Sequence, residues 1–475
     1  MSTQKRKLLH LYNRAAFGVS PSAYTSLEAK PAKEAAVLLR NSCESKPIKV
    51  LTESPFAKYR DQMNMRRERG AIRQMVQKEV RESRGKIRDM NLAWMNQMTD
   101  PDTMVREKLT LFWHDHFGVR NLVGYYAQEH NNTLRKHALG KYGDLLMAVT
   151  KDPAMLQFLN NQQNVKRNPN ENYARELLEL FTLGRGHYTE ADIKNAARAF
   201  TGWGHDRFNG AFRFRRFQHD EGQKQFMGKT GNLNGDDIIN IVLENPQTAQ
   251  FLSAKLFQYY VSDSPDPEVI DIMAKRLYKT DYDIADLLKF TFQSDWFYED
   301  RFINQKIKSP IELINGFRTQ LGLSFGQPLA MLYMQRVMGQ ILFLPPSVNG
   351  WPVGAEWIDH SSLVNRMRMP GALSAGNELN IRPKDDGDDN NPLKRNGSRL
   401  VRTARMNFEA FMTLPGIRGS HREMIDSLSH FLINQDLPEK TKLSMLAEVS
   451  HGKVKESPVQ WAAVTIAGLP EYQLN

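Results

Sequence analysis

The chain contains a single cysteine, Cys43, among its 475 residues. One cysteine excludes an internal disulfide and any cluster of thiolate ligands. No apolar run approaches the roughly 20 residues that a transmembrane helix needs, so the sequence predicts no membrane span. The basic segment 1–12 has no apolar stretch after its positive charges, and this pattern predicts no signal peptide. A cytoplasmic location is the simplest expectation, and a periplasmic one reached with a co-exported partner is the alternative.

Several common catalytic motifs are also absent. The sequence has no phosphate-binding Gly-x-x-x-x-Gly-Lys, no Gly-x-Ser-x-Gly elbow, no His-Glu-x-x-His and no dinucleotide fingerprint. These absences argue against the common nucleotide-binding, serine-hydrolase and zincin classes.

Negative charge is in deficit, and the net charge of +11 raises the question of nucleic-acid binding. Residues 58–88 hold eleven Lys and Arg against four acidic residues, which accounts for +7 of that charge. Tyr59 is the only aromatic residue in this segment, so no stacking platform interleaves the basic side chains. We expect an exposed basic helix or loop that does not bind nucleic acid. Contact with an acidic partner or another polyanion remains the alternative.

Helical patterns run through most of the chain, and start signals mark several helices. Asn168 before a proline predicts a helix start. Thr189 with Asp192, and Ser309 with Glu312, have the spacing of capping boxes, in which each side chain bonds the other residue's backbone N–H.

The helix predicted after Asn168 carries an unusual polar arc. At about 100° per residue, Glu171, Arg175, Glu176 and Glu179 share one side, and apolar residues take the rest. Arg175 lies four residues from both Glu171 and Glu179, so we expect it to pair with both. The arc is either a shielded polar site or a solvated face held by Glu–Arg pairs.

These patterns predict a mainly α protein, large and multi-helical, with a small β-hairpin insert near residues 205–230. An Asn-Gly turn signal and alternating Phe and Arg in 211–217 indicate the hairpin. We expect a main helical domain over residues 1–382 and a flexible polar insertion over 383–398. The C-terminal helices of 399–475 are expected to pack on the main body.

Histidines mark two further places where chemistry could occur. His114 and His116 are candidate metal ligands, although two-residue spacing points side chains apart on a regular helix. His219 and Asp220 follow the predicted hairpin, with Lys224 nearby, and a His-Asp pair can orient a general base. The alternatives are ordinary core histidines at the first place and an ordinary turn at the second. Trp203, Trp351 and the loop that contains Pro345 and Pro346 are candidate pocket walls, with ordinary core tryptophans as the alternative.

Long stretches of the chain resemble a bacterial family catalogued as domain of unknown function 1800. The matching motifs are His10–Gly18, Arg106–Phe117, Asn170–Gly184, Tyr188–Asp192, Ala199–Trp203, His219 and Asp220 with Lys224, Lys308–Glu312, Pro345–Pro352 and Pro470–Gln473. Relatives commonly have a neighbouring gene for a protein similar to the alkaline phosphatase and sulfatase superfamily, often with a twin-arginine export signal. The resemblance therefore implies such a partner, but no established chemistry.

Two hypotheses of function follow. In the first, the protein binds or hydrolyses a ligand at a polar site between helices, with a divalent metal at His114 and His116 as one variant. The candidate catalytic residues are Glu176, Glu179, Arg175, His219, Asp220 and Lys224. A carboxylate or His219 would act as general base, and Arg175 or Lys224 would stabilise an anion. In the second, the protein is a non-enzymatic partner or chaperone of the phosphatase-like protein.

Overall fold

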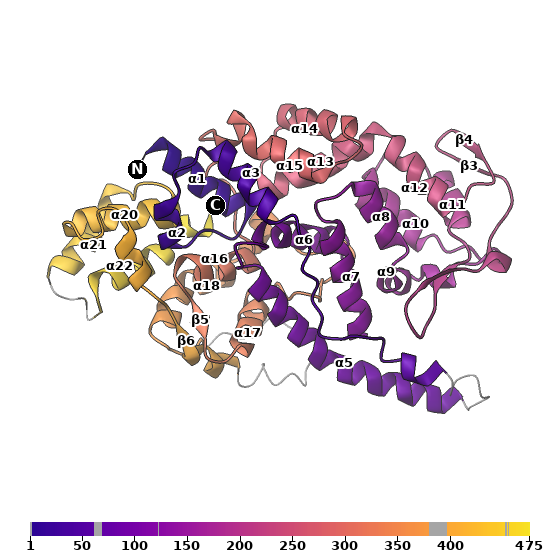
Figure 1. Cartoon of the computed structure of the whole chain (residues 1–475), viewed down its shortest axis with the longest axis horizontal. Helices are drawn as coiled ribbons and strands as arrows, with labels where there is room; N and C mark the ends of the chain where they lie inside the picture. Colours follow the sequence, from indigo (N-terminus) through magenta and orange to yellow (C-terminus); the bar gives the residue numbers. More distant parts are fainter. Residues whose placement is uncertain (1, 61–68, 122, 380–396, 452–453, 455) are drawn as a thin grey trace.

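The computed structural model describes residues 2–60, 69–121, 123–379, 397–451, 454 and 456–475, and helices make up 61% of the chain. The prediction of a mainly α protein is confirmed. Figure 1 shows an elongated molecule with α20–α22 at one end and α11, α12 and the β3–β4 hairpin at the other. No helix among the described residues has the length and apolar character needed to cross a bilayer.

The elements follow one another along the chain with few long connections. Residues up to 163 form α1 (Thr3–Ala15), α2 (Pro21–Ser26), α3 (Pro31–Asn41), η1 (Ala57–Tyr59), α5 (Arg69–Gln97), α6 (Met104–His116), α7 (Gly124–His137), α8 (Tyr142–Thr150), α9 (Pro153–Phe158) and η2 (Asn161–Gln163). Residues 172–298 form α10 (Asn172–Glu176), η3 (Leu177–Thr182), α11 (Glu190–Ala199), β1 (Trp203–His205), β2 (Phe212–Phe214), η4 (Arg216–Gln218), β3 (Lys224–Phe226), β4 (Lys229–Gly231), α12 (Gly235–Glu244), α13 (Pro246–Tyr260), α14 (Pro267–Lys279), α15 (Ile284–Gln293) and η5 (Asp295–Tyr298). The remainder forms α16 (Pro310–Gln320), β5 (Ser324–Phe325), α17 (Leu329–Met338), η6 (Gly354–Trp357), α18 (His360–Ser374), η7 (Val401–Thr403), β6 (Ala404–Arg405), η8 (Glu409–Thr413), α20 (His421–Ile433), α21 (Glu439–Ser450), α22 (Pro458–Ala467) and η9 (Pro470–Gln473).

Both predicted capping boxes are confirmed. At the start of α11, Thr189 accepts from the backbone N–H of Asp192, whose carboxylate accepts from the N–H of Thr189. Ser309 and Glu312 do the same at the start of α16. These signals act within four residues of each other, so they need no tertiary contact to be predictable.

The predicted helix start at Asn168 is wrong. The Asn168 N–H donates to the carbonyl of Val165 in a turn, and α10 begins only at Asn172. The Asn170 side chain accepts from the N–H of Asn172 at 3.0 Å, which places the capping oxygen two residues later than expected. Asn168 and Asn170 are both of the residue type that is preferred as an N-cap, so the sequence alone did not decide which of them caps the helix.

The continuation of α10 is a π-helix, η3, and this changes which residues share a face. Its hydroxyl bond from Thr182 Oγ1 to the carbonyl of Leu177 spans five residues at 2.7 Å. A π-turn is wider than an α-turn, so an arc drawn at the α-helical angle fails beyond Glu176. The predicted pairing of Arg175 with Glu179 is therefore wrong, whereas the pairing of Arg175 with Glu171 is confirmed at 3.3 Å.

The strands form three two-stranded antiparallel sheets in the described part of the chain. β1 pairs with β2 in the register Trp203–Phe214, and β3 pairs with β4 in the register Lys224–Gly231. Both hairpins lie in the region predicted for the insert. The third sheet, β5 with β6, joins residues about 80 positions apart in the chain and was not predicted.

The C-terminal helices contact the rest of the chain at several points. The Tyr472 hydroxyl donates to Gln320 on α16 at 2.7 Å, and the Asn434 side chain donates to the carbonyl of Arg6 on α1. The predicted insertion 383–398 lies almost wholly outside the described residues. The basic segment 58–88 is described except for residues 61–68, and its second part belongs to α5, which continues to Gln97.

A buried ion pair joins α6 to α16 in the middle of the chain. Lys108 Nζ lies 2.5 Å from Glu312 Oε1, and the two side chains are 1% and 3% exposed. Glu312 also accepts from the N–H of Ser309 at 2.6 Å and lies 3.4 Å from Lys306 Nζ. Burial alone would raise the pKa of Glu312, but Lys108 and Lys306 hold it well below its usual range. Glu312 is therefore charged. It caps the start of α16 and neutralises the charge of Lys108 on α6.

Removing the charge of Glu312 should strongly destabilise the fold. Glu312→Gln leaves Lys108 and Lys306 buried without their carboxylate, and breaking a buried pair in this way costs about 3–5 kcal/mol. Glu423→Gln is the matched control, because Glu423 closes the same kind of capping box at the exposed start of α20. Urea unfolding should show a large loss for Glu312→Gln and a small one for Glu423→Gln; equal losses would contradict the role of the buried pair.

The buried lysines also give stability a direction with pH. Burial lowers the pKa of Lys308 to about 7 and that of Lys108 to about 8, both far below the 10.5 of an unperturbed lysine. Between the lowered pKa values of the folded chain and the 10.5 of the unfolded chain, the unfolded chain binds more protons than the folded one. The free energy of unfolding therefore rises with pH over this range. We expect the thermal midpoint measured by calorimetry to increase from about pH 7 to 9.5, and to increase less in Lys308→Met. A wild-type midpoint that falls over this range would refute it.

Candidate functional site

A cavity of about 80 Å³ lies between α6 and α13 and is closed by the loop after α17. Four charged residues border it: Asp115 on α6, Lys255 on α13, Asp263 just after α13 and Lys306 before α16. Trp351 from the closing loop supplies part of an aromatic wall. The volume exceeds what one water molecule needs, and the wall offers several polar partners. This space, called here the α6–α13 cavity, suits a small polar ligand.

The closing loop is held by Asp115 and passes close to Asp263. The Trp351 N–H donates to Asp115 Oδ1 at 2.7 Å. Gly350 has φ = 76°, and a Cβ at this position would overlap the Asp115 carboxylate. Gly354 has φ = 55°, and a Cβ there would lie 3.1 Å from Cγ of Asp263. The loop therefore approaches the carboxylates as closely as it does because glycine occupies both positions.

Asp115 and Lys255 form a titratable pair on this cavity. Burial raises the pKa of Asp115 to about 6, although the Trp351 N–H and Lys255 favour its charged form. Burial lowers the pKa of Lys255, and Asp115 opposes that shift. Within the described part of the chain, neither Asp115 Oδ2 nor Lys255 Nζ has a hydrogen-bond partner, and neither atom is fully enclosed. Opposed shifts at one cavity are typical of acid–base sites.

His116, a predicted site residue, borders the same cavity as a neutral ring. The Tyr142 hydroxyl donates to the carbonyl of Phe181 at 2.5 Å, so it must accept from His116 Nε2–H at 3.1 Å. The lone pair is then on Nδ1, which is enclosed and has no hydrogen-bond partner in the described structure. Burial lowers the pKa of His116 well below its usual value, which keeps the ring uncharged.

His114 lies on the other side of α6 and does not border the cavity. The Phe343 N–H donates to His114 Nε2 at 3.0 Å, so the lone pair that a metal would need is occupied. Burial lowers the pKa of His114 to about 3. Across the described residues, no group of three or more His, Cys, Asp or Glu is placed to hold a metal ion. The metal role of His114 and His116 stays a prediction, without a set of ligands around it.

The predicted arc on α10 and η3 makes ion pairs at the partly exposed surface. Arg175 donates to both oxygens of Glu190, at 2.9 and 3.0 Å, which fixes the start of α11. Glu179 accepts from Arg185 at 2.5 Å, and this bond holds the pKa of Glu179 below its usual value. Burial, together with Glu179, raises the pKa of Glu176.

Of the predicted residues behind the hairpins, His219 borders a second, more open cavity of about 510 Å³, whereas Asp220 and Lys224 do not line it. His219 Nδ1–H donates to the carbonyl of Thr201 at 2.9 Å, which leaves the lone pair on Nε2. Asp220 accepts from Arg198 at 2.7 Å, and this bond lowers the pKa of Asp220. Lys224 Nζ donates to the carbonyl of Gly222 at 3.0 Å. These contacts hold the turn in shape.

The arc and the His219 turn do not meet. Arg175 contacts Glu190 at the start of α11, whereas Asp220 contacts Arg198 near its end. Eight residues of helix separate these contacts by about 12 Å. The single polar site expected from the sequence is thus divided between two places, and of the candidate catalytic and metal-binding residues only His116 borders the α6–α13 cavity.

Of the four charged residues of the α6–α13 cavity, Lys255, Asp263 and Lys306 had no sequence signal. Each is a single charged residue without a motif around it, so no local pattern separated it from surface charges. Two signals were usable. Asp115 lies between the two histidines that were singled out, and Trp351 belongs to the loop that was expected to form a pocket wall.

The close contact between Gly350 and Asp115 can be tested by adding one methyl group. Gly186→Ala is the matched control, because Gly186 has φ = 86° and nothing within 4 Å of the added Cβ. The control should lose about 1–2 kcal/mol from the backbone conformation alone. Gly350→Ala should lose clearly more, since the loop must also move off Asp115. Chemical denaturation measures both, and equal losses would refute a tightly fixed loop.

The comparisons with known proteins give one family and no closer relative. No curated protein and no solved structure gives a significant match to the chain. The family model described as a protein of unknown function, DUF1800, matches residues 10–474. The partnership with a phosphatase-like protein stays a prediction from the resemblance. Because the match extends from the first helix to the final residues, the chain belongs to the DUF1800 family of proteins of unknown function.

Proposed function

We propose that this protein binds a small polar ligand in the α6–α13 cavity and hydrolyses it. The observation that carries the proposal is that an accessible carboxylate oxygen, Asp115 Oδ2, and an accessible ammonium, Lys255 Nζ, border the same small cavity. Charged groups without hydrogen-bond partners in a shielded place are costly, and such groups are kept where they act on a ligand.

The chemistry available to this pair is general acid–base hydrolysis. Asp115 Oδ2 would take a proton from a water molecule as its oxygen attacks the ligand, and would return the proton to the leaving group. The Lys255 ammonium would stabilise the negative charge that develops on the attacked group. His116 would serve as a neutral wall, and Trp351 would help to exclude bulk water.

The other predicted residues fit this proposal as supporting parts. Phe181 on η3 contacts Tyr142, and Tyr142 contacts His116, so the helix that carries Glu176 and Glu179 helps to fix one wall of the cavity. We propose a positioning role for this helix, through its buried side. His219 would line a separate cavity behind the hairpins, and Asp220 and Lys224 would hold the adjoining turn through their contacts with Arg198 and Gly222.

Hydrolysis of the p-nitrophenyl esters of acetate, phosphate and sulfate tests the proposal. We expect the wild type to accelerate at least one ester, and Asp115→Asn and Lys255→Met each to reduce that rate by about 10²-fold. Lys275→Met is the control, because Lys275 is 77% exposed on α14 and, among the residues that the structure describes, pairs only with Asp271. Circular dichroism should confirm that all variants are folded. An ester whose rate is the same in all four proteins would contradict the assignment of the site.

A further inference from the structure

We infer that the ligand of the α6–α13 cavity carries a small oxyanion group, of the phosphate, sulfate or carboxylate kind. The inference rests on the proposed function only for the location of the site. Its own support is the charge of the layer directly behind the cavity, which the proposed hydrolysis does not use.

Five buried cations surround one buried carboxylate in that layer. They are Arg14, Lys108, Lys306, Lys308 and Arg366, and the carboxylate is Glu312. Each of the five cations is less than 9% exposed. Asp263 on the cavity wall acts on Arg14 as a second carboxylate. The layer is joined to the cavity by Lys306, whose Nζ also lies over the Tyr259 ring at 5.4 Å.

Several donors in this layer lack a partner. Arg14 Nη2 donates to the carbonyl of Phe302 at 2.8 Å, but its Nε and Nη1 have no partner within the described structure. Arg366 Nη1 donates to the carbonyl of Lys308, and its Nη2 has none there. The buried Tyr260 hydroxyl is also unpartnered in that part of the chain. Unpaired buried donors commonly mark an ordered water or an ion.

The sign of the electrostatic potential in the cavity follows from the excess of buried cations over carboxylates in this layer. Burial lowers the pKa of Lys308 to about 7, so near neutral pH it carries only part of its charge. Even with Lys308 neutral, four cations remain against Glu312 and Asp263. In a shielded, low-dielectric place such an excess acts strongly on a nearby charge. On the cavity wall, the charges of Lys255 and Asp115 offset one another. The net positive charge of the layer behind the wall therefore favours an anionic ligand.

The ligand would lie with its oxyanion toward Lys255 and Lys306 and away from Asp115. Lys255 Nζ is free to donate to it. Asp115 would repel the anion while it holds the closing loop through Trp351. The Asp115 carboxylate would therefore weaken binding of the anion and yet be needed for its hydrolysis. A merely structural role of the charges would not produce these opposite effects.

Titration calorimetry with inorganic phosphate, sulfate and acetate tests the inference, at constant ionic strength and with tetramethylammonium chloride as the cationic probe. We expect at least one oxyanion to bind the wild type, and the cation not to bind. Lys255→Met should weaken that binding about tenfold, the loss expected for one charge-assisted hydrogen bond. Lys255→Arg should retain most of it, and Lys275→Met should leave it unchanged.

Asp115→Asn gives the deciding result. The amide keeps an oxygen for the Trp351 N–H but removes the repelling charge, so oxyanion binding should tighten about tenfold. A variant that had merely lost its fold could not bind more tightly. Weaker binding in Asp115→Asn, or binding of the cation in place of any oxyanion, would overturn the inference. Ester hydrolysis that depends on Lys255 without oxyanion binding would overturn it and leave the proposed function standing. Oxyanion binding without hydrolysis would support it and restrict the protein to binding.

Discussion

The carboxylate of Glu312 is the group on which the centre of this structure depends. It closes the capping box of α16, pairs with Lys108 of α6 and lies within reach of Lys306. Without it, the buried cations gathered from α1, α6, α18 and the segment before α16 would repel one another with no carboxylate between them. The charge is therefore what allows four helices that are distant in sequence to meet.

This arrangement leaves an excess of positive charge that the carboxylates of the fold do not neutralise. A core of well-packed apolar side chains would have joined the same helices at no cost in desolvation, as replacements of buried ion pairs show in other proteins. Retaining five cations there is easier to understand if a ligand makes use of them. The α6–α13 cavity lies directly in front of the layer, and the Asp115 carboxylate holds the loop that closes it.

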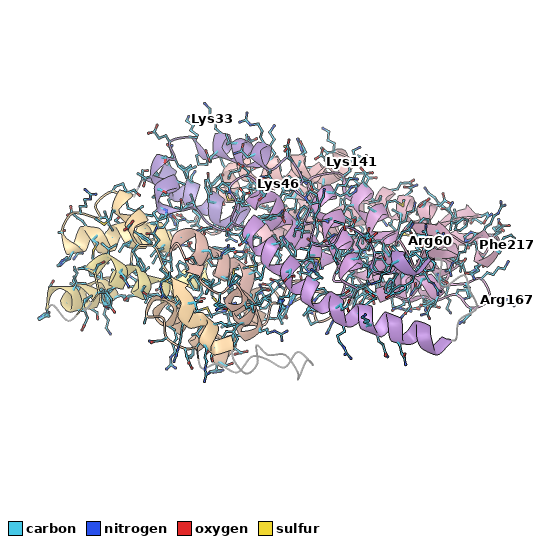
Figure 2. All side chains as sticks on the ribbon, turned by 60° about the horizontal axis from the view of Figure 1, so that its bottom comes forward. Lys33, Lys46, Arg60, Lys141, Arg167 and Phe217 are labelled. Atoms are coloured by element: carbon cyan, nitrogen blue, oxygen red, sulfur yellow. The ribbon has the colours of Figure 1, made fainter. Side chains whose placement is uncertain are left out.

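The surface ion pairs differ from the buried pair of Lys108 and Glu312 in their exposure to solvent. Arg175 with Glu190, and Glu179 with Arg185, lie where solvent screens them, and pairs of this kind contribute little to stability. At the far end, Phe217 is 93% exposed, and Figure 2 shows it on the part of the molecule that also carries Arg60 and Arg167.

The sequence by itself determined the helical class, the capping boxes at Thr189 and Ser309, and the hairpins near residues 205–230. Each of these depends on residues close together in the chain, where side-chain type and spacing act directly on the backbone. It also singled out His116 and the Trp351 loop, two parts of the cavity wall. The tertiary structure decided the rest. The π-helical turn at η3 moved Glu179 from Arg175 to Arg185, and competing asparagines shifted the start of α10. The meeting of Asp115, Lys255 and Lys306 depends on burial and on residues up to about 190 positions apart. Neither is visible in local spacing, because a lone lysine has the same pattern whether it faces water or lies beside a buried carboxylate.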